Sequence, residues 1–252
     1  MQIYRDPYTK LNTPTVIALG CFDGVHTAHA AVIREAVGIA RELGALPCVW
    51  CFAEPPRNTF AKTPVPLITS LGEKTALIAA LGAEILVCPD FTREIARVSA
   101  RDFVCGILSE CAGAVHLVSG RNYSFGSGGE GDSAMLAALC GELGIGYTAV
   151  SDVSVDGVGV SSTEIRRAAA EGRCAAASRL LGRAISVEFT LTDGRYVSDA
   201  SRLAPADGEY LARIGGTPVR VRITRAGNTP VLELDTAVSE PRLRVEFDSD
   251  RI

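Results

Sequence analysis

Short apolar runs alternate with amphipathic segments over about the first 180 residues of the chain. The apolar runs are 4–9 residues long and favour buried strands, whereas apolar positions recurring every three to four residues favour helices. The predicted strands are TVIALGCF, ALPCVWCF, AEILVCPDF, AVHLVSG and GYTAVSDV, in chain order. The predicted helices between and after them are AAVIREAVGIARELG, SLGEKTALIAALG, SARDFVCGILSECAG, DSAMLAALCGELG and STEIRRAAAEGRCAAASRLLGR.

This alternation predicts an α/β fold, with a mainly parallel, Rossmann-like sheet and helices on both of its faces. Ligands of such sheets bind at the carboxyl ends of the strands, near the point where the strand order reverses. We expect the first helix to begin near residues 25–27 and to end at Gly44, and we expect Ser99 to cap a later helix.

The pattern changes near Ile185, where short runs alternate apolar and polar residues between Gly, Asn and Pro. Period-two alternation with such turns is typical of antiparallel strands. We therefore predict two domains, an α/β domain over residues 1–184 and a small antiparallel β module over residues 185–252.

Composition narrows the class of protein. The chain has 252 residues, of which 47% are hydrophobic and 21% are charged, and a net charge of −4. No long basic block is present, which argues against nucleic acid as the main partner. The first ten residues lack the apolar core of a signal peptide, and no apolar run is long enough to cross a bilayer. We expect a cytoplasmic protein without a membrane partner.

The eight cysteines are scattered through apolar segments and are expected to be buried and reduced. Cys48 and Cys51 form a C-x-x-C spacing, but they lie inside a predicted strand rather than at a helix start. No second pair or histidine at zinc spacing completes a metal site.

Two of the three histidines, His26 and His29, stand at the predicted junction between the first strand and the first helix. Their spacing places both imidazoles on one side of the first helical turn, where free amides and the helix dipole favour phosphate. A partial metal site and two surface histidines are alternatives, but His116 lies in a distant strand and does not complete a metal site. Asn122 follows another strand, at an edge where ligands are expected.

Five segments in register resemble the bacterial bifunctional riboflavin kinase/FAD synthetase family of the nucleotidyltransferase superfamily. They are GCFDGVHTAH, CFAEPPRNTF, PLITSLGEKTALIAALGAE, SGRNYSFGSGGEGD and VGVSSTEIRRAAAEG. The resemblance implies an FMN adenylyltransferase, which converts ATP and FMN to FAD and pyrophosphate with Mg²⁺ and without a covalent enzyme intermediate. The partners it implies are small molecules, ATP and FMN.

The resemblance also implies roles for residues of this chain. His26 and His29 would contact ATP phosphates and, with Arg166, stabilise the charge of the reaction. Ser162 or Thr163 is expected to cap a helix, and both would hold phosphate. The residues implied for ATP are Gly20, Phe22, Asp23, His26, His29, Ser162, Thr163 and Arg166, and those implied for the flavin are Phe52, Pro56, Phe60 and Asn122.

The sequence departs from the family pattern at three positions. Ala28 stands where the family has a glycine, Cys21 where it has an asparagine, and Pro55 where its flavin-side loop has a histidine. The last departure affects the expected flavin contacts more than the nucleotide contacts.

The C-terminal module resembles a shortened riboflavin kinase barrel. Residues 198–201 read S-D-A-S where the family has P-T-A-N, although Glu233 falls near the family's catalytic glutamate. We expect the kinase activity to be lost, and the module is a candidate for stabilising a homo-oligomer. Two alternatives remain for the whole chain: a nucleotidyltransferase for another phosphate-bearing acceptor, and a non-catalytic flavin or nucleotide sensor.

Overall fold

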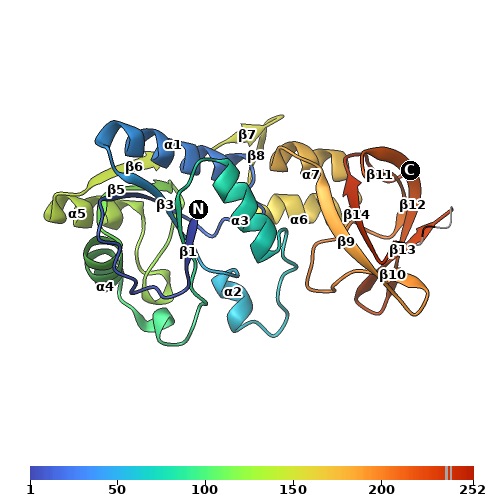
Figure 1. The fold of residues 1–252 in the computed structure, drawn as a ribbon, viewed down its shortest axis with the longest axis horizontal. Coiled ribbons are helices and arrows are strands. Elements are labelled where there is room, and N and C mark those ends of the chain that lie inside the picture. The colour runs from blue at the N-terminus through green and yellow to red at the C-terminus, as the bar shows by residue number, and fades with distance from the viewer. Residues whose placement is uncertain (236–237, 239) are drawn as a thin grey trace. The chain divides into compact units, whose positions relative to one another are not determined.

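The computed structural model describes residues 1–235, 238 and 240–252. The described chain forms two compact units, one of Met1–Thr63 with Leu71–Asp152 and one of Pro64–Ser70 with Val153–Ile252. The first unit holds a parallel sheet with helices, and the second holds a closed antiparallel barrel with two helices among the described residues (Figure 1). The fold class expected from the sequence is therefore confirmed.

The sheet of the first unit has the strand order β1-β4-β3-β2-β5-β6, and all neighbouring strands run parallel. The five predicted strands correspond to β2–β6, and β1 is an additional edge strand. The strands are β1 Gln2–Tyr4, β2 Thr15–Leu19, β3 Leu46–Trp50, β4 Ile85–Val87, β5 Ala114–Gly120 and β6 Gly146–Val150. The helices are α1 Thr27–Leu43, α2 Pro56–Thr59, α3 Leu71–Ala80, α4 Ala100–Asp102 and α5 Ser133–Leu143, with a π-helix at Phe103–Cys111 and 3₁₀ turns at Ile95–Arg97 and Ser127–Gly129.

Both faces of this sheet are buried, which explains why its strands are apolar runs without alternation. In β2, Val16 and Ala18 pack with α1 and α3, whereas Ile17 and Leu19 pack with α5 and the π-helix. Alternate side chains of one strand point to opposite faces, so each strand contributes to two separate cores.

The strand order reverses between β2 and β5. From β2 the chain proceeds through β3 to β4 in one direction, and it returns to add β5 and β6 on the other side of β2. The carboxyl ends of β3, β2 and β5 are thus neighbours at one edge, flanking the switch point where such sheets bind ligands.

The ends of α1 agree with the sequence prediction. The helix begins at Thr27 after an N-cap at His26 and ends at Gly44, which adopts the left-handed conformation with φ of 62°. Ser99 accepts a hydrogen bond from the Asp102 amide and caps α4, also as expected.

The segment after Ser99 differs from the expected α-helix, because from Phe103 it winds as a π-helix. The Ala112 amide donates to the Ile107 carbonyl, five residues back, at 2.9 Å. This winding brings residues four to five apart onto one face, and Phe103, Ile107 and Ala112 are all buried.

The barrel of the second unit closes in the strand order β10-β13-β12-β11-β14-β9. A closed barrel leaves no edge strand exposed, which suits a module this small. The strands are β9 Ile185–Thr192, β10 Arg195–Val197, β11 Gly208–Ile214, β12 Thr217–Ala226, β13 Thr229–Leu234 and β14 Arg242–Phe247. This unit also contains the β7 Ser154–Val155 and β8 Val158–Gly159 hairpin and helices α6 Ser162–Ala170 and α7 Cys174–Leu181.

The compact units do not divide at the predicted boundary between residues 184 and 185. Strand β9 does begin at Ile185, but α6 and α7 pack into the barrel core through residues such as Ile165 and Leu180. The Leu67 segment also joins this unit, where Leu67 donates to the Ser201 carbonyl and accepts from the Leu203 amide. Packing between residues far apart in the chain cannot be predicted from local composition, which explains the difference in the boundary.

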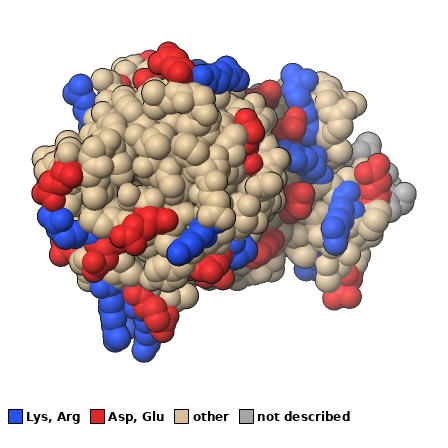
Figure 2. All heavy atoms as spheres, turned by 60° about the vertical axis from the view of Figure 1, so that its left-hand side comes forward, with Lys and Arg blue, Asp and Glu red and all other residues tan. Residues whose placement is uncertain are grey.

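All eight cysteines lie in the described residues and are free thiols, and Cys48, Cys51, Cys88, Cys140 and Cys174 are buried. Among the described helices, none combines the length and apolar content that a bilayer-spanning helix needs. On the face shown in Figure 2, acidic and basic side chains are intermingled around a broad area of uncharged residues.

Replacing Gly113 by Ala is expected to destabilise the first unit. Gly113 has a φ of +66°, and a Cβ built there lies 2.5 Å from the Thr13 carbonyl oxygen. Strain of this kind costs about 1–3 kcal/mol of unfolding free energy. Chemical denaturation measures the loss. Gly38→Ala, in open space on α1, is the control and should stabilise by about 0.5–1 kcal/mol; equal effects of the two substitutions would contradict the prediction.

Candidate functional site at the carboxyl edge of the sheet

The turn between β2 and α1 is strained. Phe22 and Val25 have φ values of 52° and 38°, in a region that residues with side chains rarely adopt. A Cβ at Gly20 would lie 2.9 Å from the Phe22 ring, so glycine is needed there for the ring to pack against the main chain. Such strain is concentrated at functional sites, where the surrounding structure maintains it.

His26 ends this turn as the N-cap of α1. Its Nδ1 accepts a hydrogen bond from the His29 amide at 3.2 Å, and the imidazole is buried. An accepting Nδ1 places the proton of a neutral His26 on Nε2, which makes Nε2 the donor of this ring. The two imidazoles stack with their centroids 3.5 Å apart and an interplanar angle of 13°.

His29 is partly buried, and its Nδ1 atom is buried without a hydrogen-bond partner among the described residues. The edge of Phe22 contacts its ring at a centroid distance of 5.1 Å. Burial lowers the pKa of His29 well below its ordinary value of 6.5, and the charges of His26 and Lys74 lower it further. His29 is therefore a neutral imidazole at neutral pH. The pair predicted from the sequence is brought together as a stacked unit at the start of α1.

Asn122 follows β5 at the same edge of the sheet. Its side chain is exposed, and Nδ2 donates to Asp152 Oδ1 at 3.2 Å. The next aromatic residues, Tyr123 and Phe125, stack on each other at 5.7 Å and pack in the core, which fixes the backbone that carries Asn122. The Glu130 carboxylate holds the following glycine-rich loop by accepting from the Ala100 amide at 2.7 Å.

The residues implied for the flavin lie in the segment after β3. Phe52 contacts the edges of Trp50 and Phe91 at centroid distances of 4.9 and 4.8 Å. Pro56 is the first residue of the short helix α2, where proline is well tolerated. Phe60 ends that helix and is 54% exposed, so it presents a free aromatic surface to solvent.

Lys74 is a residue of this edge that the sequence patterns did not single out. It is only 2% exposed, and its ammonium donates to the carbonyls of Phe52 and Ala53, each at 2.8 Å. A signal was present, because Lys74 stands four residues before the buried Ile78 and therefore on the apolar face of α3.

Cys51 and Cys88 lie side by side directly after β3 and β4, with their sulfurs 3.7 Å apart. The Cys51 thiol donates to Cys88, and this hydrogen bond is the main cause that lowers the pKa of Cys88 to about 7. Cys48 is not a partner in this hydrogen bond. Burial raises the pKa of the Cys48 thiol to about 12. The neighbour of Cys51 is thus Cys88 rather than its partner in the C-x-x-C spacing.

In the second unit, the N-cap of α6 is Ser161, which accepts from the Glu164 amide at 3.2 Å. The sequence predicted Ser162 or Thr163 for this role. That prediction is wrong by one or two residues, because Ser161 and Glu164 have the spacing of a capping box. Ser162 and Thr163 occupy the first turn instead.

Arg166, one turn further along α6, donates to the carbonyls of Pro66 at 2.7 Å and Ser162 at 3.1 Å. The side chain is thereby held against the first turn of its own helix. Its neighbour Arg167 is exposed and pairs with Glu164 and Glu171.

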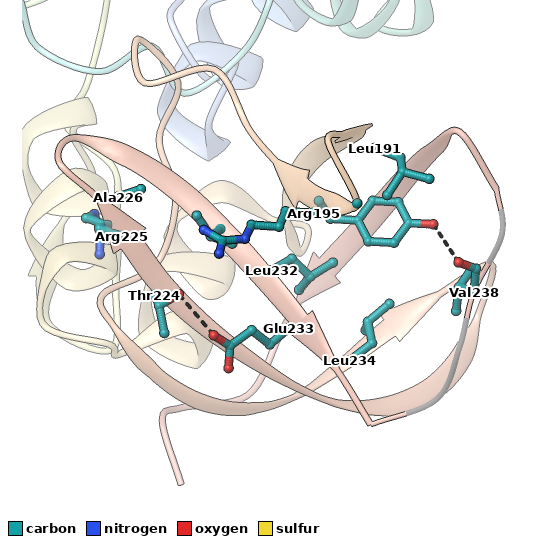
Figure 3. A pocket seen from close by; sticks show the side chains of 12 residues that line it. Leu191, Arg195, Thr224, Arg225, Ala226, Leu232, Glu233, Leu234 and Val238 are labelled. Carbon is teal, nitrogen blue, oxygen red and sulfur yellow. Dashed lines mark hydrogen bonds between the residues drawn. The ribbon is translucent and has the colours of Figure 1, made fainter.

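The barrel carries a separate pocket of about 540 Å³ (Figure 3). Glu233 on β13 points toward Thr224 on the neighbouring β12, with Glu233 Oε1 3.5 Å from Thr224 Oγ1. The lining also includes Arg195 and Arg225, but residues 198–201 do not line it. That segment forms a turn in which Asp199 accepts from the Ser201 amide at 2.8 Å.

The structure thus brings together His26, His29 and the loop of Gly20, Phe22 and Asp23, with Asn122 and the Phe52 segment on the two flanking strands. Asp23 is 3% exposed. The Phe22 side chain is fully buried, so only the main chain of Phe22 can contact a ligand. Ser162, Thr163 and Arg166 belong to the other compact unit.

Comparison with known proteins agrees with this geometry. Residues 8–164 match the profile of the FAD synthetase family. A bifunctional riboflavin kinase/FMN adenylyltransferase from Pseudomonas fluorescens is 33% identical over 81% of this chain and 61% of its own length. An FAD synthetase from Listeria monocytogenes is 28% identical over 80% of this chain and 82% of its own length. The match to this chain spans about 60% of the length of the bifunctional relatives.

Among solved structures, one of a macrolide-efflux protein from Streptococcus pneumoniae has a TM-score of 0.83 and 22% sequence identity. The match covers 100% of this chain and 91% of that one. At this identity the likeness concerns the fold alone, and it includes the C-terminal barrel.

The depressed pKa of His29 predicts how stability varies with pH. Below the ordinary value of 6.5, unfolded chains bind a proton that folded chains exclude, so the free energy of unfolding falls as pH decreases. The substitution His29→Gln should make the free energy of unfolding depend less steeply on pH, because the contribution of His29 is lost. Urea denaturation between about pH 5 and 7.5 measures this dependence. Burial also lowers the pKa of His116, so His116→Gln is the control for its contribution. An unchanged slope in His29→Gln would contradict a neutral, buried His29.

Proposed function

Because the chain belongs to the FAD synthetase family, we propose that it is an FMN adenylyltransferase that makes FAD and pyrophosphate from ATP and FMN. The observation that carries the proposal is the edge where β3, β2 and β5 end. There a histidine pair at a helix N-terminus lies between an aromatic segment and an exposed amide. Relatives that carry this activity in their names support it.

The proposed reaction is a direct displacement. An oxygen of the FMN phosphate attacks the α-phosphorus of ATP, the bond from that phosphorus to the bridging oxygen breaks, and pyrophosphate leaves with the electron pair. Such transfers depend on positioning and on stabilisation of the phosphate charge rather than on a protein nucleophile. His26 donates from Nε2 to a phosphate oxygen, and neutral His29 extends the same donor surface.

Ser162, Thr163 and Arg166 are proposed to hold phosphate. The first turn of α6 offers main-chain amides and the hydroxyls of Ser162 and Thr163 to phosphate oxygens. Arg166 supplies a cation that its bonds to Pro66 and Ser162 already orient, so less entropy is lost when it meets phosphate.

FMN is assigned to the segment after β3 and to the end of β5. Phe52, Pro56 and the exposed Phe60 offer apolar surface to an isoalloxazine ring. Asn122 can both donate to and accept from a flavin or a ribityl chain. Pro55, which replaces the histidine of the family's loop, is buried and fixes the turn into α2.

Mg²⁺ is proposed to arrive with ATP. The described residues contain no group of three or more His, Cys, Asp or Glu side chains placed to hold a metal ion. In the proposal the magnesium ion is held mainly by phosphate oxygens and water, as is usual for nucleotide substrates. When bound, the ion neutralises charge on the transferring phosphate.

The C-terminal barrel is proposed to have lost riboflavin kinase activity. Residues 198–201 form a closed turn that packs against Leu67, and they stand outside the pocket that contains Glu233. A role for the barrel in a homo-oligomer stays a prediction, which light scattering of the purified protein checks. Eight free thiols and the proposed nucleotide substrates suit a cytoplasmic protein.

Purified protein with Mg²⁺-ATP and FMN should form FAD, measured by chromatographic separation of the flavins. His29→Ala should lower the rate by about 10²–10³-fold, because a preorganised donor to phosphate is lost. The matched control is His116→Gln, at the third histidine, and it should retain the wild-type rate. Circular dichroism of both variants checks that they fold.

Riboflavin in place of FMN should yield neither FMN nor FAD. Formation of FMN from riboflavin would show that the barrel is an active kinase. Absence of FAD from FMN, with ATP still bound, would overturn the adenylyltransferase and favour another acceptor or a sensor.

Removal of Mg²⁺ is expected to abolish FAD formation. Excess EDTA should stop the reaction, and added Mg²⁺ should restore it, because the ion neutralises charge on the transferring phosphate. Turnover that persists in EDTA would contradict the metal requirement.

A further inference from the structure

Lys74 is a buried cation that the proposed chemistry has not yet used. The chain has three lysines, and the other two, Lys10 and Lys62, are exposed. The Lys74 ammonium forms no ion pair with a carboxylate of the described residues, and the acceptors of its hydrogen bonds are two main-chain carbonyls. A buried charge balanced only by neutral dipoles is costly, and an uncharged side chain of similar volume would fill the space at lower cost.

The two carbonyls lie where the chain leaves the sheet. Phe52 and Ala53 follow the last residue of β3 and Cys51, and they lead into the Pro55–Pro56 turn and α2. The same backbone is held from the other side, since Cys51 donates to the Val87 carbonyl at 3.0 Å and Ala53 donates to the Pro89 carbonyl at 2.9 Å. Lys74 thus completes the anchoring of the segment that carries the Phe52 ring.

We propose that Lys74 is a positioning residue for the flavin: its buried ammonium fixes the backbone of Phe52 and Ala53, and so sets the aromatic segment that receives FMN. This inference rests on the proposed FMN adenylyltransferase. Lys74 acts through the backbone and does not touch the reacting phosphates.

The ammonium also acts on the histidine pair through its field. Its charge contributes to the lowered pKa of His29, along with burial and His26. The same charge acts on two nearby thiols. The hydrogen bond to Cys88 and burial raise the pKa of Cys51, and the Lys74 charge opposes that rise. The hydrogen bond from Cys51 lowers the pKa of Cys88, and the Lys74 charge adds to that decrease. One buried cation therefore connects the segment after β3 with the protonation of the phosphate-binding histidine after β2.

The test compares Lys74→Met with the wild type in steady-state FAD formation, with FMN and ATP varied separately. Methionine retains the apolar stem and removes the ammonium. The expected result is a rise of about tenfold or more in the KM for FMN, with the KM for ATP within about twofold of the wild type. Lys74→Arg, which keeps the charge and the donors, should recover much of the FMN affinity. Lys10→Met, at an exposed lysine, should match the wild type.

The pH profile separates positioning from a merely structural role. Removing the ammonium raises the pKa of His29, so the acidic limb of kcat/KM should move to higher pH in Lys74→Met and stay in place in Lys74→Arg. His26 is the other charged group that acts on His29, and it is unchanged in both variants. A lower melting temperature with unchanged KM values and an unchanged pH profile would overturn the proposal.

Two further measurements keep the test decisive. If Lys74→Met does not fold, Lys74→Gln retains an amide donor without the charge, and the same rise in the KM for FMN is expected. FMN binding, followed by quenching of flavin fluorescence, reports on Lys74 without turnover. Wild-type protein that binds FMN but forms no FAD would overturn the proposed function alone, whereas equal FMN affinity of wild type and Lys74→Met would overturn the inference alone.

Discussion

The parallel pairing of β2 with β3 on one side and β5 on the other is the constraint on which the candidate site depends. Parallel strands place their carboxyl ends at one edge, and the point beside β2 where the strand order reverses is where such sheets bind ligands. Three segments distant in sequence, following Leu19, Trp50 and Gly120, therefore become neighbours. Burial of β2 and β3 on both faces of the sheet makes that edge rigid.

On this rigid edge the local chemistry is set by a strained turn. Phe22 and Val25 both lie in the left-handed region, and the Phe22 ring is buried against Gly20 and packs with the His29 ring. The turn delivers His26 as the cap of α1, and the cap in turn fixes the tautomer of its imidazole. The fold thus fixes the surface proposed to bind phosphate before any ligand arrives, and a preorganised surface stabilises charge without further rearrangement.

Polar and charged groups at the edge are few and mutually dependent. The burial of Lys74, the stacking of His26 on His29 and the adjacent thiols of Cys51 and Cys88 share one small region. In a region of low polarity each charge affects its neighbours strongly, so the protonation of one group is set by the others. The segment after β3, proposed for the flavin, and the start of α1, proposed for phosphate, therefore interact through electrostatics as well as through the sheet.

Local pattern determined most of the elements of this protein, although not β1 or the π-helix at Phe103–Cys111. Apolar run length, Gly44 at the end of α1 and Ser99 as a cap are written in neighbouring residues, and so is the change to alternating strands at Ile185. The histidine pair and Asn122 were also visible, since each directly follows a predicted strand. What only the tertiary structure decided depends on contacts between distant residues: the burial of Lys74 against Phe52, the meeting of Cys51 with Cys88, and the packing of α6, α7 and Leu67 with the barrel. These contacts join residues that are far apart in the chain, and the periodicity of neighbouring residues therefore cannot predict them.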